Sequence, residues 1–224
     1  MTVVYLHALP LDERMWPMGA HAQRPMGTHA PRLYGRGRTM DEWAGSVLDE
    51  LPGRLVLVGA SMGGYCALAA ARLAPERVEG IVLAGSRPDP DTPERHAKRA
   101  ETIALVRDRG AEGIWRSMRE QLFSPDAPPA LVERAGTMAL GRTEDELIAA
   151  VEAIRDRPDS TGAYRALGDR RLTIVGDHDP YVPVEDARGF DPDVVVLEGC
   201  GHLPSLERPE EFARLVEEAV ARWT

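Results

Sequence analysis

A pentapeptide at residues 59–63 constrains this chain more than any other feature. It reads GASMG and fits the pattern G-x-S-x-G, with Ser61 at its centre. The continuous apolar run 55–58 comes just before it, and a helix-like segment over 62–74 follows. A serine on a tight turn between a strand and a helix projects its hydroxyl above the sheet edge, and the flanking glycines leave room for the turn. The pattern predicts a serine nucleophile; a plain strand–loop–helix in which Ser61 caps the helix is the alternative.

Apolar runs alternate with helix-like segments along most of the chain. The runs are continuous rather than alternating, which is typical of strands buried on both faces of a sheet. Strand and helix in series indicate a doubly wound, mostly parallel α/β sheet. The predicted strands lie at 3–6, 55–58, 78–83, 172–175 and 194–197, with a weaker one near 29–33, and the predicted helices lie at 41–51, 62–74, 184–189 and from 209 onward.

The stretch 87–160 breaks this rhythm. It opens in proline-rich sequence and contains no strand-like run. We interpret it as a helical lid of about four helices inserted in the core, with residues 1–86 and 161–224 as the two parts of an α/β core. Its helix signals are an N-cap with a first-turn proline at Thr92-Pro93, a stop at Gly110, and a capping box formed by Thr143 and Glu146.

Two further polar segments follow predicted strands after the insertion. The strand 172–175 runs into Gly-Asp-His-Asp at 176–179, and the last strand runs into a Gly-rich turn that ends at His202. Parallel strands present their carboxyl ends at one edge of a sheet, so these side chains and Ser61 should gather there. A histidine in that position can take the proton from Ser61, while a buried carboxylate orients its imidazole.

Four stretches carry a resemblance to a known family: VVYLHALPLDERMW, LVLVGASMGGYCALAAARLAPERV, GDHDPYVP and GCGHLPSLERPEEF. With the chain order serine, aspartate, histidine, they make the chain similar to the α/β-hydrolase superfamily, in its lipase- and esterase-like branch with a helical lid. In the lid, only residues 157–160 resemble the family. The chain departs from it in two ways: it resembles a member without the first two strands, and the usual His-Gly is replaced by His7-Ala8.

The resemblance implies which aspartate serves as the catalytic acid. The family pattern places a glycine three residues before the aspartate and a proline a few residues after it, and Gly176, Asp179 and Pro183 match that pattern. Asp179 is therefore the predicted acid. Asp177 remains the alternative, because it can equally cap the loop by accepting backbone N–H groups.

The resemblance also implies an oxyanion hole made by the backbone N–H groups of Leu9 and Met62. His7 is interpreted as a structural brace for the loop that carries Leu9. Trp115 and Phe123 in the lid are candidates for lining a mostly apolar substrate pocket, although packing is the simpler role for both.

Composition excludes several other classes of function. The formal net charge is −9 and the pI is near 5.2, which argues against binding of nucleic acid or of an anionic membrane surface. No apolar stretch is long enough to span a bilayer, and the N-terminus does not read as a secretory signal, so we expect a cytoplasmic protein. Cys66 and Cys200 are expected to be packing residues, and no metal or other cofactor is implied; a cluster of His178 with its neighbouring aspartates is the weak alternative.

The sequence thus predicts a cofactor-free serine hydrolase that acts on a small carboxylic ester, thioester or lactone through an acyl-enzyme. The expected partner is a small-molecule acyl substrate. Hydrolysis of a C–C bond, perhydrolysis or a lyase reaction on the same triad stays open, because the fold does not decide the reaction. A receptor-like protein that binds a ligand with little turnover is the alternative from a different class.

Overall fold

Six parallel strands form one sheet in the computed structural model, which describes residues 1–16 and 27–223. The predicted α/β fold with a parallel sheet is confirmed, and every strand pairing in the described residues is parallel. The weak strand predicted near 29–33 is a two-residue strand one position earlier. In the sheet order β2-β1-β3-β4-β5-β6, the strands are β1 (Thr2–Leu6), β2 (Thr28–His29), β3 (Leu55–Ala60), β4 (Val78–Ala84), β5 (Arg171–Gly176) and β6 (Val195–Leu197).

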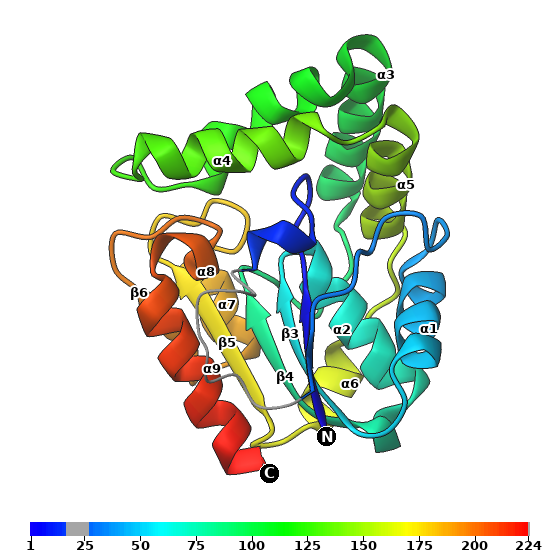
Figure 1. The fold of residues 1–224 in the computed structure, drawn as a ribbon, viewed down its shortest axis with the longest axis vertical. Coiled ribbons are helices and arrows are strands. Elements are labelled where there is room, and N and C mark those ends of the chain that lie inside the picture. Colours follow the sequence, from blue (N-terminus) through cyan, green and yellow to red (C-terminus); the bar gives the residue numbers. More distant parts are fainter. Residues whose placement is uncertain (17–26, 224) are drawn as a thin grey trace.

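Helices cover both faces of the sheet, because successive residues of a strand point to opposite sides. In β3, Leu55 and Leu57 belong to one hydrophobic core, and Val56 and Val58 to another. Figure 1 shows the C-terminal helix on one side of the sheet and helices from the first half of the chain on the other. Outside residues 87–160, the helices are α1 (Met40–Glu50), α2 (Met62–Leu73), α6 (Thr161–Ala166), α7 (Val184–Phe190), α8 (Pro204–Glu207) and α9 (Pro209–Trp223), with 3₁₀ turns η1 (Glu13–Met15) and η2 (Pro75–Arg77).

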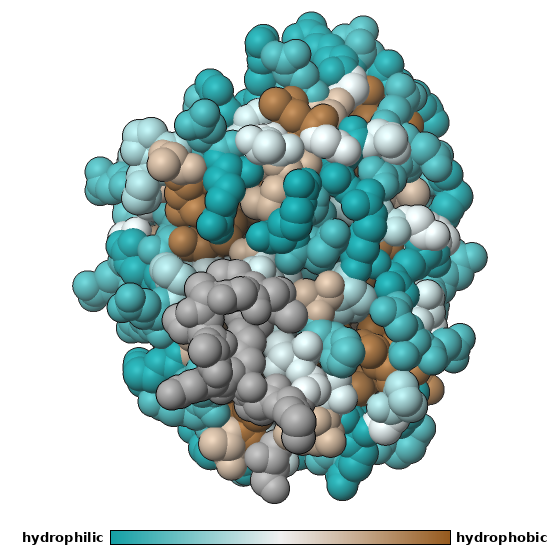
Figure 2. Space-filling model, in the orientation of Figure 1, coloured by the Kyte–Doolittle hydropathy of each residue, from teal (hydrophilic) through white to brown (hydrophobic). Residues whose placement is uncertain are grey.

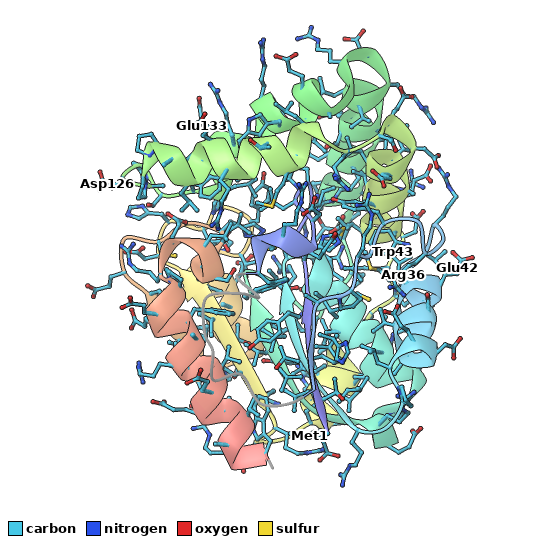
Figure 3. All side chains as sticks on the ribbon, viewed as in Figure 1. Met1, Arg36, Glu42, Trp43, Asp126 and Glu133 are labelled. Atoms are coloured by element: carbon cyan, nitrogen blue, oxygen red, sulfur yellow. The ribbon has the colours of Figure 1, made fainter. Side chains whose placement is uncertain are left out.

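The remaining helices lie beyond the carboxyl ends of the strands, as Figure 1 shows. They are α3 (Pro93–Leu122), α4 (Pro129–Leu140) and α5 (Glu144–Arg155). Figure 3 shows side chains projecting outward from this region, with Asp126 and Glu133 labelled. In the view of Figure 2, hydrophilic residues cover most of the visible surface and the apolar ones form separate patches. No helix among the described residues is both long and apolar enough to cross a membrane.

The predicted helix caps and the predicted stop at Gly110 are present. The Thr92 side chain accepts the N–H of Arg95, and Thr143 and Glu146 form the predicted capping box. Gly110 was expected to end the first helix. Its backbone adopts a φ of 60° and a ψ of −151°, which is not helical, so two helical segments of α3 meet at a kink there. Glycine adopts a positive φ at little steric cost, and the first segment therefore ends at Gly110 as expected, with a second segment continuing to Leu122.

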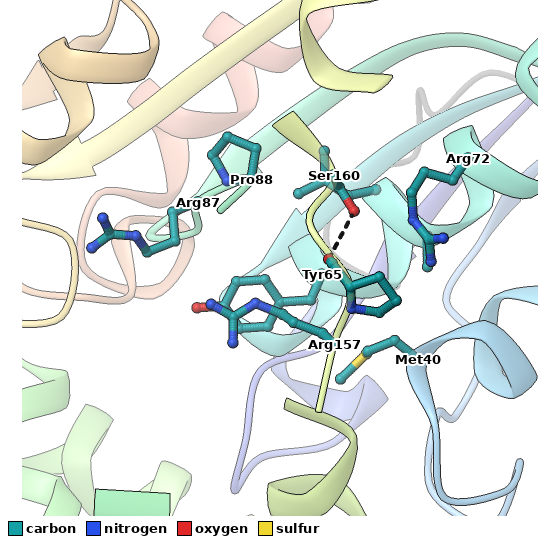
Figure 4. Close-up of a pocket in the computed structure, with 10 residues that line it drawn as sticks. Met40, Tyr65, Arg72, Arg87, Pro88, Arg157 and Ser160 are labelled. Carbon is teal, nitrogen blue, oxygen red and sulfur yellow. Dashed lines mark hydrogen bonds between the residues drawn. The ribbon is translucent and has the colours of Figure 1, made fainter. Parts of the chain in front are cut away.

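The two ends of the helical region run side by side. The N–H of Ser160 donates to the carbonyl of Pro88 at 2.9 Å. Arg157 contacts Asp91 at 2.8 Å. Its guanidinium lies over the ring of Tyr65, and Figure 4 shows these two side chains together. Because the chain leaves and re-enters the core at adjacent points, we propose that residues 87–160 form one inserted lid.

Candidate active site

Ser61 stands on a strained turn at the end of β3. Its φ of 48° makes it the one non-glycine residue with a positive φ in the described part of the chain, a conformation found mostly at functional sites. A Cβ on Gly59 would lie 2.5 Å from the carbonyl carbon of Gly63, and a Cβ on Gly63 would overlap the carbonyl of Leu6. Both glycines are therefore needed for the turn that the sequence pattern predicts.

Asp179 and His202 are in direct contact. The His202 Nδ1 lies 2.8 Å and 2.9 Å from the two carboxylate oxygens, and both side chains are buried. The Asp179 carboxylate also accepts the backbone N–H groups of Tyr181 at 2.8 Å and Val182 at 3.0 Å, which fix its orientation. An ionised carboxylate only accepts hydrogen bonds, so Nδ1 carries the proton and Nε2 is left as a base.

Asp177 has a different role. It is exposed, and its carboxylate accepts the backbone N–H of Cys200 at 3.0 Å. Desolvation raises the pKa of Asp177, but hydrogen bonds from the N–H groups of Cys200 and Gly199 outweigh it, so the pKa lies below its usual value. Asp177 thus ties together the two loops that carry Asp179 and His202, and the contact with the imidazole supports Asp179 as the acid.

The ends of β3 and β4 bring the serine and histidine loops together. The N–H of Ser61 donates to the carbonyl of Ala84 at 2.8 Å, at the end of β4. The next residue, Gly85, lies directly against the histidine: a Cβ there would be 2.9 Å from the His202 Nδ1 and would overlap its carbonyl oxygen. The ring of Tyr181 packs on the other side of His202, with centroids 4.7 Å apart. The loop that carries His202 therefore lies against the end of β4, the strand next to the one that ends at Ser61.

The two residues predicted to supply the oxyanion hole are buried, and their backbone N–H groups have no hydrogen-bond partner among the described residues. Leu9 and Met62 are 3% and 0% exposed, and neither backbone N–H donates to a partner within residues 1–16 and 27–223. Buried N–H groups without a partner are rare in folded proteins, because each costs about the desolvation of a polar group. Their position at the serine turn and on the loop after β1 makes them suited to a developing oxyanion.

His7 braces the loop that carries Leu9. Its Nε2 accepts the N–H of Leu33 at 3.0 Å, and its Nδ1 lies 3.2 Å from the carbonyl of Ala8. A backbone N–H can only donate, so Nδ1 must hold the proton and the ring is neutral. Burial is the main cause that lowers the pKa of His7 to about 4. Ala8 has no positive φ, so its Cβ causes no strain where the family has glycine.

A cavity of about 470 Å³ lies beside the site, between α3 and the core. Three of its lining residues belong to the site or adjoin it. Leu9 is a predicted oxyanion donor, Tyr181 packs on His202, and Tyr65 lies one turn after Ser61 in α2. The sequence predicted a mostly apolar pocket, but the α3 side of this cavity is charged. The charged lining residues are Arg87, Asp91, Arg95, Lys98, Arg99 and Glu101.

Trp115 and Phe123 do not line this cavity. Trp115 packs against α4, where a Cβ on Gly136 would lie 3.1 Å from its ring, and it is 8% exposed. Phe123 borders a separate cavity at the end of α3, and its backbone adjoins Gly201. Both side chains belong to the hydrophobic core between the lid and the sheet. We therefore propose a packing role for both side chains in place of the pocket role.

Sequence reasoning also missed Glu207, which connects the lid to the histidine loop. One carboxylate oxygen accepts the N–H of Gly201 at 2.8 Å, and the other accepts the N–H of Ser124 at 2.9 Å. The side chain is buried. A carboxylate five residues after His202, in the stretch that resembles the family, was the available signal. For the charged α3 side of the cavity, the available signal was the helical spacing that places Arg95, Lys98 and Thr102 on one face of α3.

Comparisons with known proteins agree with this architecture. A model of the alpha/beta hydrolase family matches residues 3–215. A pimeloyl-[acyl-carrier protein] methyl ester esterase of Aromatoleum aromaticum is 28% identical, with 97% of each chain covered. A 2-hydroxy-6-oxononadienedioate/2-hydroxy-6-oxononatrienedioate hydrolase of Burkholderia vietnamiensis is 32% identical, with 79% of this chain and 66% of its own covered. The structure of a thermophilic esterase from Thermogutta terrifontis matches with a TM-score of 0.89 and 29% identity, covering 100% of this chain and 90% of its own.

Proposed function

We infer, from the premise that this chain belongs to the alpha/beta hydrolase family, that Ser61, His202 and Asp179 form its catalytic triad. The chain is a carboxylic ester hydrolase, in keeping with its esterase relatives. The observation that carries the residue assignment is the contact of Asp179 with the His202 Nδ1 at 2.8 Å, beside a serine held on a strained turn. Conformational strain at this one residue favours catalysis over a capping role for Ser61.

The proposed reaction has two steps on the same residues. The Nε2 of His202 takes the hydroxyl proton as Ser61 attacks the ester carbonyl, and the oxyanion is stabilised by the free N–H groups of Leu9 and Met62. The protonated imidazole then gives its proton to the departing alcohol, which leaves an acyl group on Ser61. In the second step His202 takes a proton from water, the hydroxide attacks the acyl-enzyme, and the carboxylic acid leaves as Ser61 regains its proton.

We propose an ester of an acyl chain with a small alcohol as the substrate class. The Aromatoleum aromaticum relative is named for a methyl ester, and a cavity of about 470 Å³ beside the site suits a small substrate. The second candidate is hydrolysis of a C–C bond, because the Burkholderia vietnamiensis relative is named as a hydrolase of hydroxy-oxo dicarboxylates, whose names contain no ester. To separate these two candidate activities, hydrolysis of short methyl esters and hydrolysis of a vinylogous 1,5-diketone acid are measured with the same protein preparation.

The test of the triad is burst kinetics with a 4-nitrophenyl ester of a short fatty acid. The wild-type chain should release about one equivalent of nitrophenol rapidly and then turn over. Ser61→Ala should lose both phases, with kcat lower by about 10⁴-fold or more, while its circular dichroism stays that of the wild type. Ser46→Ala is the matched control, because Ser46 lies on α1 and its hydroxyl accepts a hydrogen bond from Arg36. Turnover by Ser61→Ala at the wild-type rate contradicts the assignment, and a burst without turnover in the wild type indicates a receptor-like protein.

A further inference from the structure

A buried ion pair connects the helical region above the sheet to the loop that carries Leu9. Arg142 lies in the turn between α4 and α5, and its Nη2 is 3.1 Å from the Asp12 Oδ2. The Asp12 side chain is completely buried, and that of Arg142 is 6% exposed. Asp12 lies three residues after Leu9, and Figure 1 shows α4 above the dark-blue turn η1 that follows it. The pair therefore joins this helical region to the segment that supplies one of the proposed oxyanion donors.

Both neighbouring helices fix the side chain of Arg142. Its Nε donates to the carbonyl of Met138, in the last turn of α4, at 3.3 Å. Its Nη1 lies 3.7 Å from the carboxylate of Glu146, in the first turn of α5. The guanidinium also lies over the ring of Tyr34, 5.5 Å from its centroid, and the hydroxyl of Tyr34 donates to the carbonyl of Leu11 at 2.8 Å. Arg142 is thus held in one orientation, with its Nη2 directed at the loop.

Asp12 organises the segment next to Leu9. It is the N-cap of η1, and its carboxylate accepts the backbone N–H of Arg14 at 3.0 Å. The turn η1 ends at Met15, whose Sδ accepts the N–H of Ala8 at 3.2 Å. Ala8 and Leu9 share the peptide group that contains the Leu9 N–H. A shift of the Asp12 carboxylate would therefore move η1, then the sulfur, and then the proposed oxyanion donor.

Arg142 is the buried partner of this carboxylate, whereas its other partner faces water. Arg14 contacts the Asp12 carboxylate at 2.6 Å, but the Arg14 side chain is 57% exposed, and water screens an exposed ion pair. Desolvation raises the pKa of Asp12, but the hydrogen bonds from Arg14 and the charges of Arg14 and Arg142 outweigh it, so the pKa lies below its usual value. Without Arg142, an ionised carboxylate would remain buried with a screened partner, which is costly unless the carboxylate moves toward water.

We propose that Arg142 is a positioning residue for the oxyanion hole. It holds Asp12, Asp12 holds η1, and η1 fixes the loop whose Leu9 N–H stabilises the oxyanion. This inference rests on the proposed function. A donor aimed at a developing negative charge acts mainly in the transition state. Displacement of Leu9 should therefore lower kcat and leave the KM of a neutral ester nearly unchanged.

The kinetic test compares an ester with a compound that forms an oxyanion at the same site. The ester is 4-nitrophenyl butyrate, and the inhibitor is propyl trifluoromethyl ketone. The Ser61 oxygen adds to the ketone carbon, its proton passes to His202, and the former carbonyl oxygen becomes the oxyanion. In Arg142→Gln, kcat should fall about tenfold and the Ki of the ketone should rise by about the same factor, which is part of the roughly 10²–10³-fold loss on removing one donor. Arg142→Met keeps the aliphatic stem, should behave alike, and serves where the first variant does not fold.

Two other arginines provide comparisons. Arg134→Gln removes an exposed cation from α4 and should leave kcat, KM and Ki at their wild-type values. Arg14→Gln removes the exposed partner of Asp12 and should lower kcat by less than about threefold, because exposed ion pairs contribute little. A wild-type Ki in a folded Arg142 variant overturns the proposal, even where the melting temperature falls. An equal rise in KM and Ki overturns it too, since the loss would then lie in substrate binding, as does an equal loss of kcat in Arg14→Gln.

A second measurement needs no turnover. Hydrogen–deuterium exchange, followed by mass spectrometry of peptides that cover residues 7–16, reports local opening of the loop. Deuterium uptake there should be faster in Arg142→Gln than in the wild type and unchanged in Arg134→Gln. Wild-type uptake in both variants overturns the proposal. If the wild type hydrolyses no ester, the proposed function fails, and the exchange still decides whether Arg142 holds the loop.

Discussion

The sheet edge and the lid are built in different ways. At the sheet edge, backbone contacts leave no freedom: a Cβ on Gly63 would overlap the carbonyl of Leu6, and a Cβ on Gly176 would overlap that of Cys200. In the lid, Gly110 has nothing within 4 Å of where its Cβ would lie, and the helices pack through large side chains such as Trp115. Chemistry that needs placement to a fraction of an ångström belongs on the first kind of framework, and substrate selection can reside on the second.

Exchanging each aspartate of the sheet edge for asparagine should give the largest difference. In Asp179→Asn, the backbone N–H groups of Tyr181 and Val182 fix the amide oxygen on their side, so the amide NH₂ faces the His202 Nδ1. The imidazole then adopts the wrong tautomer, and kcat should fall by about 10⁴-fold. Measurement of kcat with a 4-nitrophenyl ester checks this.

Asp177→Asn is the matched control for that exchange. Its amide oxygen can still accept the N–H of Cys200, so kcat should stay within about tenfold of the wild type, which is the effect of one neutral hydrogen bond. A larger loss in Asp177→Asn than in Asp179→Asn would mean that Asp177 is the acid. Equal losses would mean that the loop, rather than one carboxylate, orients His202.

The contrast between the two regions also explains what the sequence could predict. The elbow glycines and His202 were predicted because short-range patterns place each of them at a strand end, and parallel strands then bring the ends together. The choice of Asp179 over Asp177 came from the family resemblance. The residues that line the cavity were not identified, because the side of a lid helix that faces a substrate depends on how the lid packs. Trp115 was a candidate for the pocket, with packing as the simpler role, because a large apolar side chain in a lid helix can equally line a pocket or hold two helices together.

The charged residues that line the cavity on the α3 side were not predicted, for a related reason. Lys98 was noted only as a rarity of composition, and the pairs along α3 read as solvated helix faces. Nothing local distinguishes an arginine paired on the surface from one whose Nη1 is buried at a cavity, as in Arg95.

Trp115→Ala tests the packing role assigned in the lid. The side chain is 8% exposed and contacts α4 at Gly136, so its removal should lower the free energy of unfolding by about 3–5 kcal/mol. Chain-length preference at a temperature where the variant is folded should not change, because Trp115 does not border the cavity. Thermal melts and a series of acyl chain lengths measure the two effects. A shift in preference without loss of stability would restore Trp115 to the pocket.

His7 should give the sheet edge a pH dependence of its own. Its pKa is about 4 in the folded protein, against 6.5 for an ordinary histidine, so the unfolded chain binds more protons between these values. Stability supplied by the neutral ring is therefore complete above pH 6.5 and decreases as the pH falls toward 4, by about 3 kcal/mol in all. The comparison of wild type with His7→Gln by urea unfolding at several pH values isolates this contribution. An unchanged difference between pH 7 and pH 4.5 would contradict the assignment of a neutral brace.

Glu207→Gln should have the smallest effect and tests the connection between the two regions. The carboxylate accepts one N–H from the histidine loop, at Gly201, and one from the lid, at Ser124. Glutamine has one acceptor oxygen, so its NH₂ group must face one of these N–H donors. The same seam between the lid and the histidine loop includes His202, the proposed catalytic base, whose backbone N–H donates to the carbonyl of Leu122 at 3.1 Å.

Opening that seam should move His202 relative to Ser61, and kcat should fall by roughly 10- to 100-fold, since a buried donor left unpaired costs about 1–3 kcal/mol. The KM of a neutral ester should change little, because Glu207 does not line the cavity. The control is Glu210→Gln, an exposed carboxylate at the start of α9. If Glu207→Gln lowers only the melting temperature and leaves kcat at the wild-type value, the carboxylate stabilises the lid without positioning the histidine. A fall in kcat at unchanged KM shows that the lid contributes to placing the residues of the sheet edge as well as to selecting the substrate.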